Sequence, residues 1–219
     1  MHIPDGFLSG NINIATYAAS ALIGGYSIKR CNADFSEKQV PLLGVTASFI
    51  FAAQMINFPV GGGTSGHFLG AALAAILMGP YAACLIMTLV LVIQCLGFAD
   101  GGLTALGSNI FNMGIVGGFS SYFIFLIFKK LLPKTKKGFI AAAAITSWLS
   151  IVLVSAACAL ELAVSGTSPI HVALPAMVGV HVVIGVGEAM ITTTVLSVVY
   201  ASRPDLMPLA ERDQRGYNV

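Results

Sequence analysis

Long apolar stretches, separated by short polar or Gly/Pro-rich breaks, run along most of this chain. Stretches of this kind indicate helices that cross a membrane, each of which needs about 20 apolar residues. The pattern predicts an all-α integral membrane protein, a bundle of seven spans over residues 11–28, 40–57, 67–79, 80–98, 106–128, 138–162 and 172–201. The third span is short, and the break at Gly79-Pro80 fits either a tight turn between two helices or a kink in one longer helix.

The basic residues favour seven spans over six. With seven spans all eleven Lys and Arg fall on one side of the membrane: Lys29, Arg30, Lys38, Lys129, Lys130, Lys134, Lys136, Lys137, Arg203, Arg212 and Arg215. The positive-inside rule makes that side cytoplasmic, so the N-terminus is expected outside and the C-terminus in the cytoplasm. The outer side then has no fixed positive charge and carries Asp5, Asp100 and Glu161, which favours the approach of a cation.

Composition agrees with a membrane protein, since 57% of the residues are hydrophobic and only 9% are charged. We expect a single transmembrane domain over residues 1–219, with a short cytoplasmic tail over residues 203–219. The beginning of the chain lacks the features of a signal peptide, so Met1 is expected to be retained. The four cysteines show no zinc-binding spacing and are interpreted as packing residues. Nucleic-acid binding is not expected, because the basic stretch 129–137 reads as an inside loop.

The first residues carry the clearest chemical signal. A terminal amine followed by His2 offers three nitrogens to one metal ion: the amine, the amide nitrogen of His2 and its ring Nδ1. Ni(II) and Cu(II) prefer four nitrogens in a plane, so one ligand is missing. The segment Pro4-Asp5-Gly6 predicts a turn, with proline at its second position, that bends the metal-binding segment 1–10 back toward the membrane. The alternative is a histidine that follows the start codon by accident.

A glycine-rich outer loop over residues 57–67 offers the fourth nitrogen. Its three consecutive glycines allow close backbone approach, and it ends at His67, where the next helix is expected to begin. On the seven-span topology His67 and His2 lie on the same, outer side. A histidine that only caps a helix is the structural alternative. A phosphate loop is excluded, because its lysine is replaced by His67.

Further polar residues lie in or near the last span. His181 and Glu188 share one face of its helix, where ionisable groups either serve transport or form an internal hydrogen-bonded pair that locks helices together. A rival interpretation pairs Ser65 with His181 as the nucleophile and base of an intramembrane serine protease. That interpretation leaves the terminus without a role. His171, at the outer mouth of this helix, either attracts metal or is only interfacial.

The opening Met1-His2-Ile3-Pro4-Asp5-Gly6-Phe7-Leu8, the glycine loop ending in His67 and the seven-span outline resemble the CbiM/NikM family. These proteins are the substrate-capture (S) components of energy-coupling-factor (ECF) transporters for cobalt and nickel, and the resemblance covers essentially the whole chain. It implies a bundle with one extra N-terminal helix relative to vitamin-binding S components. It also implies a metal site at Met1, His2 and His67, made from the terminal amine, the amide and ring nitrogens of the second residue, and the loop histidine.

The resemblance further implies partners: a transmembrane coupling (T) subunit, ATPase (A) subunits and often a small accessory membrane protein, in the cell membrane of a prokaryote. The chain itself has no ATP-binding motif, so we expect a transport component and not an enzyme. The expected function is high-affinity capture and translocation of Ni(II), favoured over Co(II) because planar nitrogen ligation suits nickel better. A cobalt-specific component, the serine protease and a metal-gated channel without ATPase partners are the alternatives.

Overall fold

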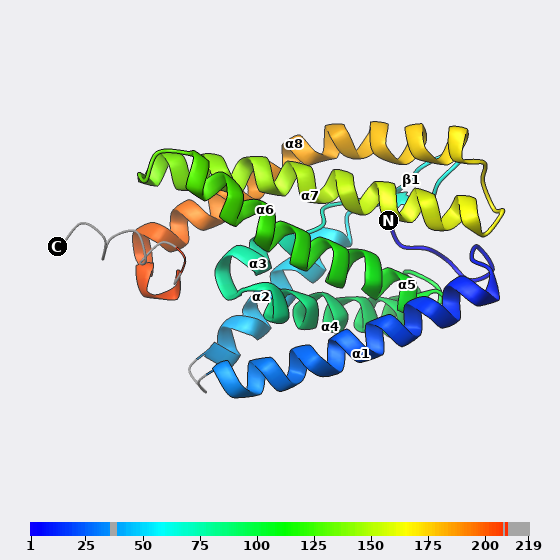
Figure 1. Ribbon diagram of the computed structural model, residues 1–219, viewed down its shortest axis with the longest axis horizontal. Coiled ribbons are helices and arrows are strands. Elements are labelled where there is room, and N and C mark those ends of the chain that lie inside the picture. The colour runs from blue at the N-terminus through cyan, green and yellow to red at the C-terminus, as the bar shows by residue number, and fades with distance from the viewer. Residues whose placement is uncertain (36–38, 208, 210–219) are drawn as a thin grey trace.

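A computed structural model describes residues 1–35, 39–207 and 209, and it is almost entirely helical (Figure 1). The elements are α1 (Gly10–Asp34), α2 (Val40–Gln54), β1 (Phe58–Pro59), β2 (Ser65–Gly66), α3 (Ala71–Met78), α4 (Pro80–Phe98), α5 (Leu106–Asn109), the π-helical η2 (Ile110–Val116), α6 (Gly117–Leu131), α7 (Lys136–Val164), α8 (Ile170–Ser202) and the 3-10 turn η3 (Pro204–Leu206). Lys38, Arg212 and Arg215, with most of the predicted tail 203–219, lie outside the described residues.

Every predicted span contains a helix, but the helices differ in length. Among the described residues, four helical stretches are long and apolar enough to cross a bilayer: Pro80–Phe98, Leu106–Leu131, Lys136–Val164 and Ile170–Ser202. The apolar helix α2 has 15 residues and α3 has 8. At about 1.5 Å per residue α3 is only about 12 Å long, so it is too short to cross the hydrocarbon core on its own.

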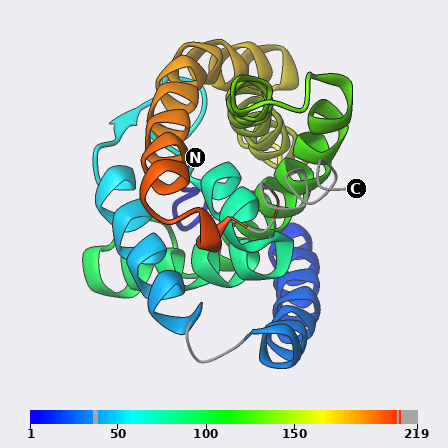
Figure 2. The ribbon, with the colours of Figure 1, turned by 90° about the vertical axis from the view of Figure 1, so that its left-hand side faces the viewer.

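The break between α3 and α4 is a tight turn, which decides between the two arrangements that the sequence leaves open. Gly79 ends α3 and precedes α4 with φ 85° and ψ 173°, and Pro80 is the first residue of α4. Proline suits that position because the first helical N–H has no acceptor within the helix. All eight residues of α3 are buried, and Figure 2 shows the N-terminus in the middle of a ring of helices.

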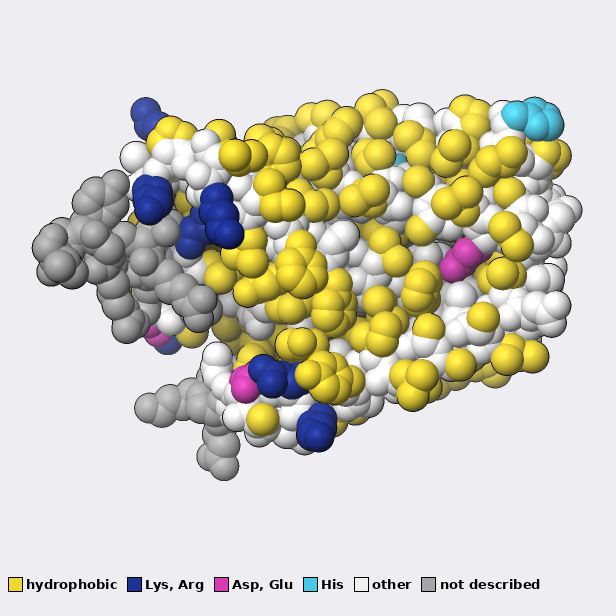
Figure 3. Space-filling model, viewed as in Figure 1, with side chains coloured by type: hydrophobic (Ala, Val, Ile, Leu, Met, Phe, Trp, Pro, Cys, Tyr) yellow, Lys and Arg dark blue, Asp and Glu magenta, His cyan; other side chains and the backbone are white. Residues whose placement is uncertain are grey.

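The basic side chains gather at one end of the molecule. Figure 3 shows them on the end at which α1, α6 and α8 finish in Figure 1. Lys129 and Lys130, for example, lie in the last turn of α6. The separation of charge along the bundle is therefore the one that the predicted topology requires.

We expect Gly79→Ala to lower the free energy of unfolding by about 1–3 kcal/mol, because its backbone conformation is essentially closed to residues with a Cβ. Gly97→Ala is the matched control: it lies in α4, and a Cβ there meets nothing within 4 Å. That substitution should leave stability unchanged or raise it by about 0.5–1 kcal/mol. Thermal unfolding in detergent measures both, and equal midpoints would show that the turn imposes no such strain.

Candidate metal centre

The first three residues lie inside the bundle. Met1 and Ile3 are fully buried and His2 is 4% exposed. Asn109, at the end of α5, holds this segment from two directions: its Oδ1 accepts from the Ile3 N–H (2.8 Å) and its Nδ2 donates to the Ile3 carbonyl (3.1 Å). The Gly102 N–H donates to the same carbonyl (2.8 Å). Both backbone groups of Ile3 are therefore paired, as burial requires.

The predicted turn forms one residue later than expected. The Phe7 N–H donates to the Pro4 carbonyl (3.4 Å) and Gly6 has φ +82°, so proline takes the first turn position and not the second. A positive φ at the third position requires a residue such as glycine, and this fixes where the turn lies. The Asp5 carboxylate holds the turn by accepting from the Thr104 N–H (2.7 Å) and hydroxyl (2.6 Å), bonds that lower the pKa of Asp5. The terminus is bent inward, as the sequence predicts.

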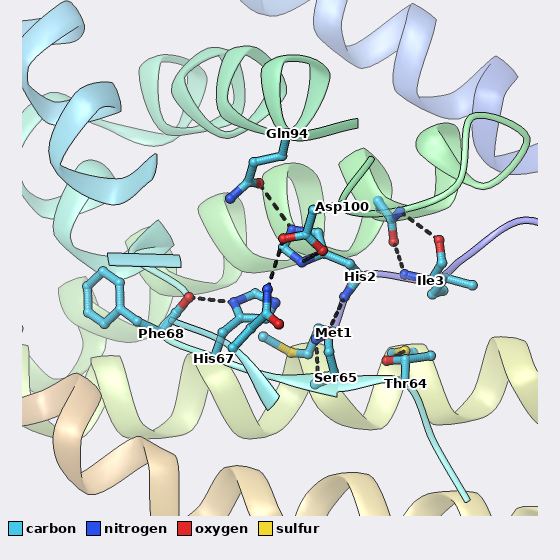
Figure 4. Close-up of polar contacts among 12 residues, drawn as sticks. Met1, His2, Ile3, Thr64, Ser65, His67, Phe68, Gln94 and Asp100 are labelled. Carbon is cyan, nitrogen blue, oxygen red and sulfur yellow. Dashed lines mark hydrogen bonds and ion pairs between the residues drawn. The ribbon is translucent and has the colours of Figure 1, made fainter. Parts of the chain in front are cut away.

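The imidazoles of His2 and His67 meet in this buried region (Figure 4). Their ring centroids are 4.4 Å apart and their planes differ by 16°, while His67 is only 1% exposed. The fold thus brings together two histidines that are remote in the chain. Because the rings lie face to face, one of them must rotate before a nitrogen from each ring reaches a shared ion.

Each of these rings has one nitrogen engaged and one nitrogen free. Nδ1 of His67 lies 2.7 Å from the Phe68 carbonyl, which can only accept, so Nδ1 carries the proton. Nε2 of His67 is buried and has no hydrogen-bond partner among the described residues. Nε2 of His2 lies 3.1 Å from Oε1 of Gln94, which accepts its proton. A free ring nitrogen, with a hydrogen bond on the opposite nitrogen, is the typical state of a metal-binding histidine.

Nδ1 of His2 lies 3.2 Å from Oδ1 of Asp100 and makes no hydrogen bond to any described residue. Its lone pair therefore faces a carboxylate. Two electron-rich groups at this distance repel each other, and a cation between or beside them is stabilised by both. The other oxygen of Asp100 accepts from Nδ2 of Asn57 (3.0 Å), which keeps the carboxylate in place.

The terminal amine is held by Ser65. It donates to the Ser65 carbonyl and to its hydroxyl (2.7 Å), and the same hydroxyl accepts from the His2 N–H (3.0 Å). Burial lowers the pKa of the Met1 amine to about 5. Burial, followed by the nearby amine charge, also lowers the pKa of His2 to about 3 and the pKa of His67 well below its ordinary value. At pH 7 the amine and both rings are neutral, so their lone pairs are available.

The structure does not bring together the other polar residues that the sequence suggested as functional. Nδ1 of His181 donates to the Met177 carbonyl (2.6 Å) of its own helix, and no hydrogen bond joins His181 to Ser65 or Glu188 in the described part of the chain. The pairing that a serine protease needs is therefore not formed, and the hydroxyl of Ser65 is occupied by the terminus. His171 is exposed near the beginning of α8.

Three residues that support the centre are not predicted from the sequence: Gln94, Asn109 and Asp100. Gln94 and Asn109 are buried polar residues, and Asp100 was noted only for its charge. A glutamine or asparagine within an apolar span was the available signal, because such a residue needs a partner. Within the described residues no group of three or more His, Cys, Asp or Glu side chains is arranged to hold a metal ion.

A substitution at Gly102 tests whether its close contact with Pro4 and Asp5 keeps the terminal segment in place. A Cβ at this position would lie 2.2 Å from the backbone nitrogen of Asp5 and 2.6 Å from the carbonyl carbon of Pro4, so the terminal strand must move. We expect Gly102→Ala to speed acylation of the Met1 amine about tenfold, since about 1.4 kcal/mol of destabilisation raises the open population by that factor. Mass spectrometry of the N-terminal peptide measures the rate, with Gly97→Ala as control. Labelling at the wild-type rate would show that this close approach does not fix the segment.

Comparison with known proteins identifies the family of this chain. The chain is 44% identical to a putative fused nickel transport protein NikMN of Archaeoglobus fulgidus over 209 residues, which are 94% of this chain and 68% of that protein. It is 38% identical to a putative metal transport protein of Haloquadratum walsbyi, over 94% of this chain and 93% of that protein. A crystal structure of a transition metal transporter matches with a TM-score of 0.84 and 34% identity, over 100% of both chains. Residues 2–206 match the CbiM family, described as "cobalt uptake substrate-specific transmembrane region", and the chain therefore belongs to this family.

Proposed function

We propose that this chain captures a divalent transition metal ion, Ni(II) in preference to Co(II), as the substrate-specific component of an ATP-driven ECF uptake transporter. One observation carries the proposal: the terminal amine of Met1, the backbone and ring of His2, and the ring of His67 converge in one buried region. Family membership supports a role in metal uptake. The metals named for the family and for its relatives are cobalt and nickel.

The proposed ligands are four nitrogens: the amine of Met1, the amide nitrogen and Nδ1 of His2, and Nε2 of His67. The two ring nitrogens in this set are those without a hydrogen-bond partner among the described residues. Loss of the His2 amide proton adds a negative charge, so the bound unit carries a net charge of about +1. Asp100, 3.2 Å from Nδ1 of His2, offsets that charge.

Four nitrogens in a plane favour Ni(II) over Co(II), which is the reason for preferring nickel as the substrate. Cu(II) has the same geometric preference and a higher intrinsic affinity, so selectivity against copper must come from metal supply and from the rigidity of the site. The family description names cobalt, whereas the relative from Archaeoglobus fulgidus is named for nickel. A cobalt-specific component of the same kind is the alternative that competition between the two metals tests.

The proposed topology is a single transmembrane domain of seven spans in a prokaryotic cell membrane, with the metal-binding terminus outside and with α3 and the buried residues 67–70 before it together as the third span. The gathering of Lys and Arg at the opposite end supports this orientation. A cavity of about 290 Å³, lined by residues that include His2, Asn57 and Ser65, gives the ion a route to the site. Transport energy would come from ATPase subunits through a transmembrane coupling subunit, with a small accessory membrane protein as a further partner.

An extension of the N-terminus is the sharpest test of this site. One additional residue before Met1 converts the amine into an amide and needs space at a residue that is fully buried. We expect such an extension, or acetylation of the amine, to abolish Ni(II) binding while the bundle stays folded. Isothermal titration with Ni(II) measures binding, and thermal unfolding checks the fold.

A chain with the same extra residue at its C-terminus is the control and should bind as the native chain does. Equal nickel affinity of the N-terminally extended and native chains would refute the proposed ligand set. His67→Ala should lower the affinity strongly, because it removes the fourth nitrogen. Unchanged affinity in that variant would assign the fourth position to another donor.

The number of protons released on binding is a second test. The sequence alone suggests an amine of ordinary pKa, about 8, that must lose a proton to bind metal at pH 7. The structure corrects this, because burial lowers the amine pKa to about 5 and leaves both histidines neutral. Only the His2 amide then loses a proton, so binding at pH 7 should release about one proton.

Calorimetry in buffers of different ionisation enthalpy gives this number. Since the pKa of the amine is lowered, proton competition at the amine begins only as the pH falls through about 5, and there the affinity should decrease more steeply. Release of two protons at pH 7 would mean that the amine is charged in the free protein. Release of none would exclude the amide as a ligand.

A further inference from the structure

The glycine-rich loop that carries His67 lies against α8. A Cβ on Gly63 would lie 2.3 Å from Sδ of Met177, and one on Gly66 would lie 2.9 Å from Cδ1 of Ile184. The Thr64 N–H donates to the same Met177 sulfur (3.4 Å). Gly63 and Gly66 therefore lie directly against the ends of side chains from α8. Loop and helix form one packed unit.

The carboxylate of Glu188, on α8, is hydrogen-bonded to the backbone of Leu69 and Gly70, which follow His67 in the chain. Its Oε2 accepts from the Leu69 N–H (2.7 Å) and its Oε1 accepts from the Gly70 N–H (2.8 Å). On the other side, Nε2 of Gln54 from α2 donates to the Leu69 carbonyl (2.6 Å). Glu188 is 1% exposed and Gln54 is fully buried. The backbone that follows His67 is therefore held between two helices by three hydrogen bonds.

A buried carboxylate is a costly way to bind two backbone N–H groups, since a neutral amide oxygen can also accept such a bond. The carboxylate fits better if a cation is bound nearby. Glu188 and His67 line the same cavity of about 310 Å³ between α2 and α8. With the His2 amide deprotonated, the proposed metal unit has a residual positive charge, which an anion on the His67 side stabilises.

The terminal segment, which carries the other proposed ligands, is bonded to α4 and α5. His2 is bonded to Gln94 of α4, and the Ile3 backbone is bonded to Asn109 of α5. Ser65 already joins the terminus to the loop, and a bound ion would add a second link between the terminus, held by α4 and α5, and the loop on α8. The position of the His67 ring relative to His2 therefore depends on how the loop is bonded to α8.

We propose that Glu188 is a positioning residue for metal capture. It holds residues 67–70 so that Nε2 of His67 reaches the ion. This inference rests on the proposed function and adds a residue from α8 to it. Glu188 acts through His67 and does not touch the metal.

A double-mutant cycle between Glu188→Gln and His67→Ala tests the inference. The full chain, with its native N-terminus and a C-terminal tag, is titrated in detergent with Ni(II) alone, and the visible absorption of the bound nickel is recorded. Glu161→Gln is the matched control: Glu161, on α7, is another carboxylate with a hydrogen bond inside the bundle, but its partner is Nδ2 of Asn112 (2.7 Å) and not the loop. Thermal unfolding checks each variant.

We expect Glu188→Gln to weaken nickel binding about tenfold or more, the usual effect of losing a group that orients a metal ligand. Its nickel spectrum should shift toward that of His67→Ala. In the His67→Ala background the same substitution should have little further effect, because the ligand that it positions is already gone. Glu161→Gln should keep wild-type affinity and spectrum.

Three results would overturn the inference. They are wild-type affinity in Glu188→Gln, an equal loss in the presence and absence of His67, and an equal loss in Glu161→Gln. If Glu188→Gln does not fold, the cycle is run with Glu188→Asp, whose shortened carboxylate breaks the same two bonds, and the same results decide. A native chain that binds no nickel would instead refute the proposed function.

Discussion

The burial of the Met1 amine is the constraint on which the rest of this structure depends. A terminal amine and three peptide groups placed in a low-dielectric interior lose their water, and each must find a partner or give up its charge. Ser65, Asn109 and Gly102 supply the partners, and desolvation makes the amine neutral by lowering its pKa to about 5. The result is a set of neutral nitrogen lone pairs shielded from water, which is what a late transition metal ion prefers.

Two rigid parts of the bundle meet at this terminus. One consists of α4 and α5 with the turn between them, to which His2 and Ile3 are attached through Gln94 and Asn109. The other consists of α8 with the glycine-rich loop, to which Glu188 and Met177 are bonded. If the proposed centre forms, its ligands come from both parts, and a relative movement of the two would change its affinity for the ion.

Much of the fold follows from the lengths of the apolar stretches and from the glycine and proline residues that end or begin helices. The limits of α4 over residues 80–98 match the prediction, because Pro80 sets where the helix begins. The third predicted span contains a helix of only 8 residues, because the chain from His67 to Gly70 is not helical and its backbone is bonded to Glu188 and Gln54 before α3 begins. The turn at the terminus is displaced by one residue because Gly6 can adopt a positive φ and its neighbours cannot do so without strain.

The sequence by itself determined the helical membrane character, the segregation of charge and the residues His2 and His67 as a candidate pair, because hydropathy, charge and chelate chemistry are local properties. Only the tertiary structure decided that the two rings stack 4.4 Å apart, that Asp100 faces His2, and that Glu188 holds the loop rather than pairing with His181. These contacts join positions far apart in the chain, and no local pattern encodes them. The lowered pKa of the terminal amine belongs to the same class, since desolvation depends on every helix that surrounds Met1.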